Sequence, residues 1–336
     1  MAYSPSYDST GIEYYEIPSF KFISGTTIPI RIAYRSFGPS TSSKKALIPT
    51  CYGGLINTTL TFTQSSQVLS SHHVIVTAML GNGESSSPSN TPEFPKVLDY
   101  RDCINAQHAL LTQHLNIQTP DVVLGFSMGG QQAYHWASMY PTLVKTAIVT
   151  CGSAKTSGHN YAFLEGPKTA LLNSIDYADG TYKARNVKPT RGLKAFGRAY
   201  SAWLTSGAWF RARLWEKALG FETIEDYIKG RSETAFEYWD AEDVLILARM
   251  WQASDIGKTR DDRDYTKALE EIQAKVLVMP SRTDQYFQVA DSEVEMKFLK
   301  RAELAVIETV WGHVAGGGGN EEDTAWMSER IHKFLN

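Results

Sequence analysis

The stretch that decides the fold is Val122-Val123-Leu124-Gly125-Phe126-Ser127-Met128-Gly129-Gly130. A short apolar run is followed by G-x-S-x-G and then by residues with helical spacing. At such a strand-to-helix turn the serine is lifted clear of the sheet, and side chains in place of Gly125 and Gly129 would collide with the neighbouring strand and helix. The turn also places Ser127 at a helix N-terminus, where backbone N–H groups stabilise developing negative charge. The pattern therefore predicts that Ser127 is a nucleophile.

Apolar runs of the same kind lie on both sides of this stretch. They are typical of parallel strands covered on both faces, and they comprise residues 46–48, 74–76, 147–149, 276–278 and 304–307. Residues 13–38 predict strands with turns between them, because Ile28, Ile30 and Ile32 recur at every second position. Segments with helical spacing separate the later runs. This alternation predicts an α/β fold with a mostly parallel sheet flanked by helices.

The alternation of strands and helices stops between Thr150 and Lys275. That segment has helical spacing throughout, and the apolar residues that share one face are Leu193, Phe196, Tyr200, Trp203 and Leu204. We expect a helical cap over residues 156–263, inserted into a core of residues 1–155 and 264–336. The aromatic residues either pack between cap helices or face a substrate cavity, and both interpretations stay open.

Composition excludes several classes of protein. The chain has 336 residues, of which 43% are hydrophobic and 21% charged, and a net charge of −3. These values exclude a disordered chain and a globally basic nucleic-acid binder. No run of about 18 apolar residues is present, so no membrane span is predicted.

Cysteine usage predicts a reducing compartment. Cys51, Cys103 and Cys151 are an odd and widely spaced set, which fits neither a disulfide framework nor a structural zinc site. The first residues show neither a basic stretch nor an apolar stretch of the kind found in signal peptides. We therefore expect a cytoplasmic location and no metal.

Two residues that follow later strands are candidate partners for the serine. A serine hydroxyl needs a base to take its proton, and the base must be oriented. In this architecture the partners follow in the order serine, acid, histidine. Asp284 follows the run at 276–278 and His313 follows the run at 304–307. We expect His313 to act as general base and Asp284 to orient it, with Asp291 as the reserve acid.

Backbone N–H groups are the candidate donors to an oxyanion. One donor is expected from Met128, directly after the nucleophile, and the other from Tyr52 or Gly53 in the glycine-containing loop after the run at 46–48. The four glycines at 316–319 predict a flexible segment and do not match a phosphate-binding loop.

Several stretches resemble the homoserine O-acetyltransferase family of α/β-hydrolase-fold enzymes, over most of the chain. Residues 124–133 are similar to the Gly-x-Ser-Met-Gly-Gly-Met-Gln-Ala elbow of that family. The other similar stretches are Ser86-Ser87-Pro88-Ser89, Phe94-Pro95, Tyr100-Arg101-Asp102, Ala106-Gln107, Arg191-Gly192-Leu193 and Glu225-Asp226-Tyr227. The resemblance implies an α/β-hydrolase fold with an inserted helical cap and ping-pong acyl transfer through an acyl-serine. It assigns the triad to Ser127, Asp284 and His313.

The chain departs from this family where the family holds its amino-acid substrate. Val314 stands in place of an Asp after the histidine, Leu204 begins the stretch in place of a Tyr-Arg-Ser, and Lys168 is the nearest counterpart of a carboxylate-binding Arg. Homoserine is a poor candidate, because a zwitterion needs paired charges in the site. We expect a larger and less polar substrate. Its expected contacts are Lys168, Tyr200, Trp203, Leu204 and Val314.

These observations together predict a serine-nucleophile enzyme that acts on an ester or thioester through an acyl-Ser127 intermediate. Hydrolysis of a fairly apolar small molecule is favoured. Transfer from acyl-CoA to an alcohol other than homoserine stays open, with acyl-CoA as co-substrate and no bound cofactor. Lyase-type chemistry and a non-catalytic binding protein on the same fold are further alternatives. The expected partner is a small molecule, not a nucleic acid or a membrane, and a homodimer stays open.

Overall fold

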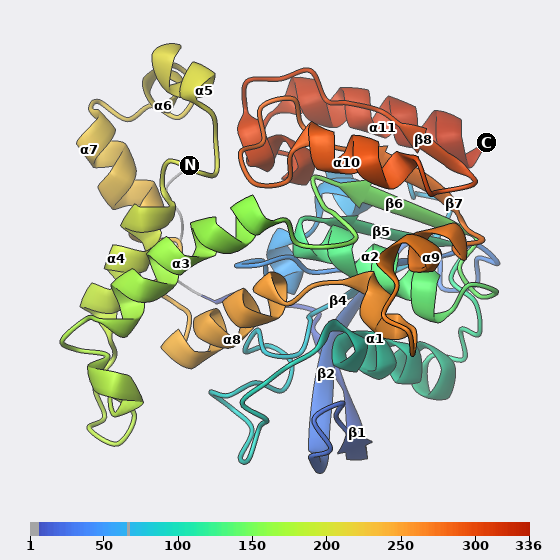
Figure 1. Ribbon diagram of the computed structural model, residues 1–336, viewed down its shortest axis with the longest axis horizontal. Coiled ribbons are helices and arrows are strands. Elements are labelled where there is room, and N and C mark those ends of the chain that lie inside the picture. The colour runs from blue at the N-terminus through green and yellow to red at the C-terminus, as the bar shows by residue number, and fades with distance from the viewer. Residues whose placement is uncertain (1–6, 66–67) are drawn as a thin grey trace.

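A central sheet organises the part of the chain described by the computed structural model, residues 7–65 and 68–336 (Figure 1). Its strand order is β1-β2-β4-β3-β5-β6-β7-β8. The strands are β1 (Glu13–Lys21), β2 (Thr27–Phe37), β3 (Lys45–Pro49), β4 (His73–Thr77), β5 (Val122–Phe126), β6 (Thr146–Thr150), β7 (Lys275–Met279) and β8 (Ala302–Leu304). β1 pairs antiparallel with β2 and β2 with β4, whereas the other neighbours pair parallel. The predicted mostly parallel sheet is confirmed.

Successive residues of the central strands enter two different hydrophobic clusters. Val123 of β5 belongs to the cluster that holds the buried residues of α1 (Tyr100–Ala109) and α2 (Met128–Met139). Val122 and Leu124 belong to the other cluster, which includes buried residues of α11 (Glu321–Leu335). Continuous apolar runs are therefore required here, because side chains alternate between two covered faces.

The last strand is shorter than the sequence predicts. β8 ends at Leu304, and beyond it Ile307 forms only an isolated bridge with Ser281. Pro280 follows β7 and has no N–H to donate, so it interrupts the ladder between the two strands. The prediction of a strand over 304–307 is therefore wrong beyond its first residue.

Helices occupy the long segment between β6 and β7. They are α3 (Gly158–Leu172), α4 (Thr190–Tyr200), α5 (Gly207–Arg211), α6 (Leu214–Lys217), α7 (Ile224–Tyr227), α8 (Ala241–Gln252) and α9 (Tyr265–Glu270). We refer to α3–α8 as the cap helices. Figure 1 shows them gathered on one side of the molecule, away from α10 (Val289–Met296) and α11. α3 packs against both α4 and α8, which ties the cap helices together.

The predicted apolar face of α4 is longer than the helix. Leu193, Phe196 and Tyr200 lie buried on α4, but the helix ends at Tyr200. Ser206 then begins α5 as its N-cap, because its side chain accepts from the N–H of Trp209. Trp203 and Leu204 therefore lie in the turn between two helices. No helix in the described ranges is long and apolar enough to cross a bilayer.

Candidate active site

The turn between β5 and α2 holds Ser127 in a strained conformation, with φ 57° and ψ −124°. A Cβ on Gly125 would lie 2.0 Å from the carbonyl carbon and oxygen of Gly129, and one on Gly129 would lie 2.6 Å from the carbonyl oxygen of Pro49. The N–H of Ser127 donates to the carbonyl of Thr150 on β6 at 2.9 Å. The strand and the helix approach so closely that both positions accept glycine alone, and the serine is forced onto the tip of the turn.

A buried acid–base pair lies beyond the ends of β7 and β8. Nδ1 of His313 lies 2.6 Å from Oδ2 of Asp284, and both side chains are almost completely buried. Oδ1 of Asp284 accepts from the N–H groups of Tyr286 at 3.0 Å and Phe287 at 3.1 Å. These donors hold the carboxylate in one orientation. With Nδ1–H given to Asp284, Nε2 of His313 is the nitrogen available to a substrate or a hydroxyl.

The imidazole of His313 is surrounded by aromatic rings. Its ring centroid lies 4.3 Å from that of Tyr286, 4.6 Å from Phe126 and 5.5 Å from Phe287. Gly312 has φ 63°, and a Cβ there would lie 2.7 Å from the backbone of Thr205. The loop that carries His313 is therefore pressed against the turn between α4 and α5, and only glycine permits that approach.

One cavity of about 150 Å³ joins the serine, the histidine and the cap helices. We call it the active pocket. Its lining residues are Tyr52, Gly53, Phe126, Ser127, Tyr200, Leu204, Arg231, Ala235, Phe236, Tyr286, His313 and Val314. Ser127 and His313 are far apart in the sequence. The sheet brings together the loop after β5, which holds Ser127, and the loop beyond β8, which holds His313, at the same edge. The structure thus brings together most of the residues that the sequence singles out.

Two expected substrate contacts lie elsewhere. Nζ of Lys168 on α3 is 2.6 Å from Oε1 of Glu165 and 2.6 Å from Oε1 of Gln252. Trp203 packs its ring against Phe163, with centroids 4.6 Å apart. Neither residue lines the active pocket. The structure thus places these two residues outside the active pocket, because α4 ends before Trp203 and Lys168 bonds side chains of α3 and α8.

Five residues of the active pocket were not predicted, namely Phe126, Arg231, Ala235, Phe236 and Tyr286. Phe126 precedes Ser127 and Tyr286 follows Asp284 by two positions, so closeness to a candidate catalytic residue could have pointed to both. Arg231, Ala235 and Phe236 follow α7 and carry no motif. Their place in the site depends on how the cap helices fold over the core.

The loop after β3 forms a tight turn at the edge of the active pocket. The N–H of Gly54 donates to the carbonyl of Cys51 at 3.0 Å, and Gly53 has φ 67°. The hydroxyl of Tyr52 donates to the carbonyl of Val244 on α8 at 3.0 Å. As the first residue of α2, Met128 has an N–H without a partner inside the helix. Tyr52 and Gly53 of this loop line the active pocket, and Met128 follows Ser127 directly at the start of α2.

The flexible segment predicted at 316–319 is instead closely packed. Gly312–Gly317 form a short helix, η7, and Gly316 is buried in it. A Cβ on Gly316 would lie 2.5 Å from Sγ of Cys151, and one on Gly317 would lie 2.7 Å from Cε1 of Phe126. These glycines therefore permit close contact with the core, and the prediction of flexibility is wrong for them.

Other nucleophiles and bases near the site are neutralised by burial. Burial raises the pKa of the Cys51 thiol to about 12 and lowers the pKa of His135 to about 4. Nδ1 of His135 bonds the carbonyl of Gln131 at 2.8 Å, which keeps the ring on α2. Burial also raises the pKa of Cys151, whose Sγ lies within 4.8 Å of ligand atoms of Asp284 and His313. A metal there would have to displace the bond between the acid and the histidine.

Comparison with known proteins identifies the family. A sequence profile of the α/β hydrolase fold matches residues 53–315, which include Ser127, Asp284 and His313. This chain belongs to the α/β hydrolase family.

Members of this family with curated functions include esterases and acyltransferases. The chain is 33% identical to an ethyl acetate hydrolase of Pseudomonas veronii over 79% of this chain and 77% of that protein. It is 32% identical to a homoserine O-succinyltransferase of Marinobacter nauticus over 70% of this chain and 64% of that protein. The resemblance to homoserine acyltransferases seen in the sequence is confirmed.

Solved structures of α/β hydrolases superpose over almost the whole chain. The acetyl esterase MekB has a TM-score of 0.87 at 28% identity and covers 96% of each chain. An acetylester hydrolase from Corynebacterium glutamicum has a TM-score of 0.89 at 26% identity, covering 96% of this chain and 95% of the other. The predicted α/β-hydrolase fold is therefore confirmed. The protein is an enzyme of the esterase and acyltransferase class, and the alternative of a non-catalytic binding protein is set aside.

Proposed function

We propose that this α/β hydrolase cleaves short-chain carboxylic esters through an acyl-Ser127 intermediate. The observation that carries the proposal is the pair of Asp284 and His313, bonded at 2.6 Å, whose imidazole shares the active pocket with Ser127. The esterase relatives support hydrolysis of small esters.

The proposed reaction has two halves. The hydroxyl of Ser127 attacks the ester carbonyl while His313 takes its proton, and the imidazolium then returns that proton to the departing alcohol. Water enters next, is deprotonated by His313 and attacks the acyl-serine, which releases the acid and restores the hydroxyl. Asp284 keeps the imidazole oriented and stabilises its cation. The N–H groups of Met128 and of Tyr52 or Gly53 hold the oxyanion in both halves.

The lining of the active pocket disfavours a substrate that carries an ammonium group, such as an amino acid. No carboxylate is among the lining residues that the structure describes, and Val314 presents an apolar side chain next to His313. An ammonium group in this pocket would have no acidic partner, and burying it unpaired is costly. Homoserine is therefore not proposed as the acceptor. Tyr200, Leu204 and Val314 are proposed to contact the substrate.

A second candidate is O-acyl transfer from acyl-CoA to an alcohol other than homoserine. The homoserine O-succinyltransferase relative favours it, because that enzyme transfers an acyl group. In this reaction acyl-CoA is a co-substrate, and an alcohol takes the place of water in the second half. The chemistry of Ser127, Asp284 and His313 is the same in both candidates.

Serine labelling combined with turnover tests the proposal. A fluorophosphonate probe should add to Ser127 by intact mass, and the purified enzyme should hydrolyse ethyl acetate and p-nitrophenyl acetate. Ser127→Ala should abolish labelling and lower kcat by roughly 10⁴–10⁶, as in other triad enzymes. The control is Ser153→Ala, which should keep both, because the hydroxyl of Ser153 donates to the carbonyl of Lys155 at 2.8 Å and does not line the active pocket. Acyl-CoA supplied with and without an alcohol separates hydrolysis from transfer. A folded wild-type protein that shows neither labelling nor turnover would contradict the proposal.

We also propose a cytoplasmic location. A homodimer is the oligomeric state that we propose to test. Cys51, Cys103 and Cys151 are free thiols, which fits a reducing compartment. Light scattering on the purified enzyme measures the oligomeric state directly.

A further inference from the structure

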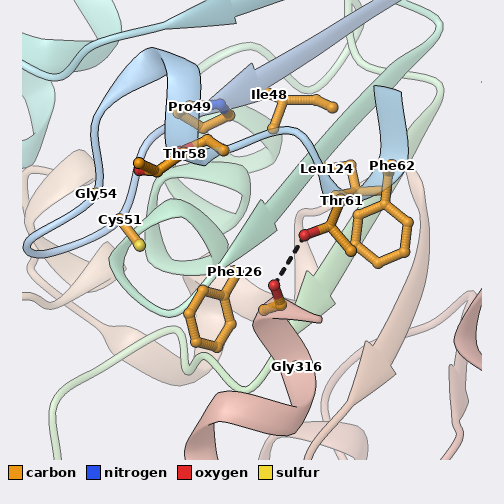
Figure 2. A pocket seen from close by; sticks show the side chains of 12 residues that line it. Ile48, Pro49, Cys51, Gly54, Thr58, Thr61, Phe62, Leu124, Phe126 and Gly316 are labelled. Atoms are coloured by element: carbon orange, nitrogen blue, oxygen red, sulfur yellow. Dashed lines mark hydrogen bonds between the residues drawn. The ribbon is translucent and has the colours of Figure 1, made fainter. Parts of the chain in front are cut away.

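A second cavity, of about 110 Å³, lies beside the active pocket. We call it the rear cavity. Figure 2 shows it between β3, the loop of Cys51–Gly54, the segment around Thr61 and Phe62, and η7. Its walls are mainly apolar and come from Ile48, Pro49, Phe62, Leu124, Phe126 and the threonines at 58, 59 and 61. A space of this size and lining suits part of an alkyl chain, since an apolar cavity of about 150 Å³ binds benzene.

Phe126 and the loop of Cys51–Gly54, which we call the oxyanion loop, separate the rear cavity from the active pocket. Phe126 lines both. Within the loop, Cys51 and Gly54 line the rear cavity, whereas Tyr52 and Gly53 line the active pocket. The two spaces therefore lie on opposite sides of one partition, which consists of a single aromatic side chain and a four-residue turn.

The ring of Phe126 packs against Gly316, Gly317 and the imidazole of His313. A Cβ on Gly316 would lie 3.2 Å from Cδ2 of the ring, and one on Gly317 would lie 2.7 Å from Cε1. On the other side, the ring centroid is 4.6 Å from that of His313. Oγ1 of Thr61 donates to the carbonyl of Gly317 at 2.8 Å, the dashed line in Figure 2, and fastens η7 across the cavity. Contacts with η7 and with His313 therefore hold the ring of Phe126 in place.

In the proposed reaction the acyl group is bonded to Ser127, the residue next to Phe126 in this partition. The alcohol must leave and water must enter, and the lining of the active pocket includes Tyr200, Leu204 and Arg231 from the long segment between β6 and β7. The acyl chain stays attached to Ser127, the residue next to Phe126, until water attacks. A chain that extends towards the core therefore meets the ring of Phe126.

We propose that Phe126 sets the length of the acyl chain by closing the active pocket off from the rear cavity, and that the rear cavity is a latent subsite for an unbranched alkyl chain. This inference rests on the proposed ester hydrolysis. Wild-type enzyme accepts short acyl groups because the ring blocks further methylenes. Removal of the ring joins the two spaces, and each methylene then buried raises kcat/KM by about fourfold.

A chain-length series tests the proposal. Wild type, Phe126→Ala, Phe126→Leu and Phe62→Ala are assayed on p-nitrophenyl acetate, butyrate, hexanoate and octanoate, with thermal melting of each variant as a check on folding. Phe126→Ala should raise the hexanoate-to-acetate ratio of kcat/KM by roughly tenfold or more, from the methylenes newly buried. Phe126→Leu should give a smaller rise and keeps a branched side chain if the alanine variant does not fold. Phe62→Ala enlarges the rear cavity without removing the partition, so it should keep the wild-type profile.

The outcomes separate this inference from the proposed function. If wild type hydrolyses acetate and both folded Phe126 variants keep its chain-length profile, the inference fails and the esterase function stands. A shift with Phe62→Ala as large as that with Phe126→Ala would also overturn it, because the ring would then not be the partition. If no protein in the series turns over any ester or is labelled at Ser127, the proposed function fails and this inference with it.

Discussion

The elbow and the cap helices position their side chains by different means. At the elbow, backbone contacts such as the 2.0 Å that a Cβ on Gly125 would make with Gly129 permit one local conformation, and Ser127 follows from it. In the cap, Tyr200 is placed by rings from distant segments, with centroids 6.3 Å from Tyr52 and 4.9 Å from Phe163. Placement by backbone sterics depends on a few consecutive residues, whereas placement by packing depends on the whole fold.

After Ser127→Ala, replacing the acid of the pair should have the largest effect on activity. Asp284→Asn keeps the shape but removes the charge that orients His313, so kcat should fall by roughly 10³–10⁴. Asp291→Asn is the matched control on α10, since Asp291 was the reserve acid and does not bond His313. Steady-state hydrolysis of p-nitrophenyl acetate measures both. Equal losses of kcat in the two variants would contradict the assignment of Asp284 as the acid that orients His313.

Glycine-to-alanine changes compare the two regions directly. Gly125→Ala places a Cβ 2.0 Å from backbone atoms of Gly129 and should cost more than about 4 kcal/mol of unfolding free energy or prevent folding. Gly158 lies exposed at the first position of α3, where a Cβ meets nothing within 4 Å. Gly158→Ala should leave the unfolding free energy within about 0.5 kcal/mol of wild type, because the added methyl group collides with nothing. Urea denaturation measures both, and similar values would remove the distinction drawn between elbow and cap.

The junction between core and cap should depend on pH through Glu295 on α10. Its Oε1 accepts from the N–H of Ala154 at 2.7 Å and the hydroxyl of Tyr265 at 3.2 Å. Burial raises its pKa from 4.5 to about 7, so the native state holds the proton more tightly than the unfolded state does. The resulting stabilisation is complete below pH 4.5 and is lost as the pH rises through about 7.

Glu295→Gln stays neutral and should not undergo this loss. Relative to wild type, its unfolding free energy should improve by about 1–3 kcal/mol between pH 5 and pH 8. The exposed Glu293→Gln on the same helix is the control and should leave the pH dependence as in wild type. Denaturation curves at several pH values measure the difference, and parallel curves for all three proteins would argue against a protonated Glu295.

A small effect is expected from removing one hydrogen bond between the core and the cap. The hydroxyl of Tyr52 donates to the carbonyl of Val244 at 3.0 Å. Tyr52→Phe removes this donor but keeps the ring among the cap aromatics, so the unfolding free energy should fall by about 1 kcal/mol. If the loss of this bond only changes the position of the cap helices over the active pocket, KM for p-nitrophenyl acetate should change more than kcat. A large loss of kcat instead would mean that the bond positions the oxyanion loop itself.

The sheet and the elbow were predictable because their signals are local. Apolar runs of three residues, covered on both faces, marked each central strand, and the collision at Gly125 and Gly129 follows from the strand-to-helix turn. The prediction of a strand over 304–307 was wrong beyond Leu304, since Pro280, directly after the neighbouring strand β7, interrupts the ladder. It was also wrong for the glycines of η7, which serve contact with Phe126 and Cys151 and not flexibility.

By itself, the sequence determined the order of strands and helices, the strained serine turn and the candidate acid and histidine, because periodicity and backbone sterics act between residues close along the chain. The tertiary structure alone decided that Lys168 bonds Gln252 on another cap helix, that Arg231 and Phe236 reach the active pocket, and that Phe126 lines two cavities. Those outcomes depend on which surfaces of segments far apart in the chain pack together, and no short stretch of sequence carries that information.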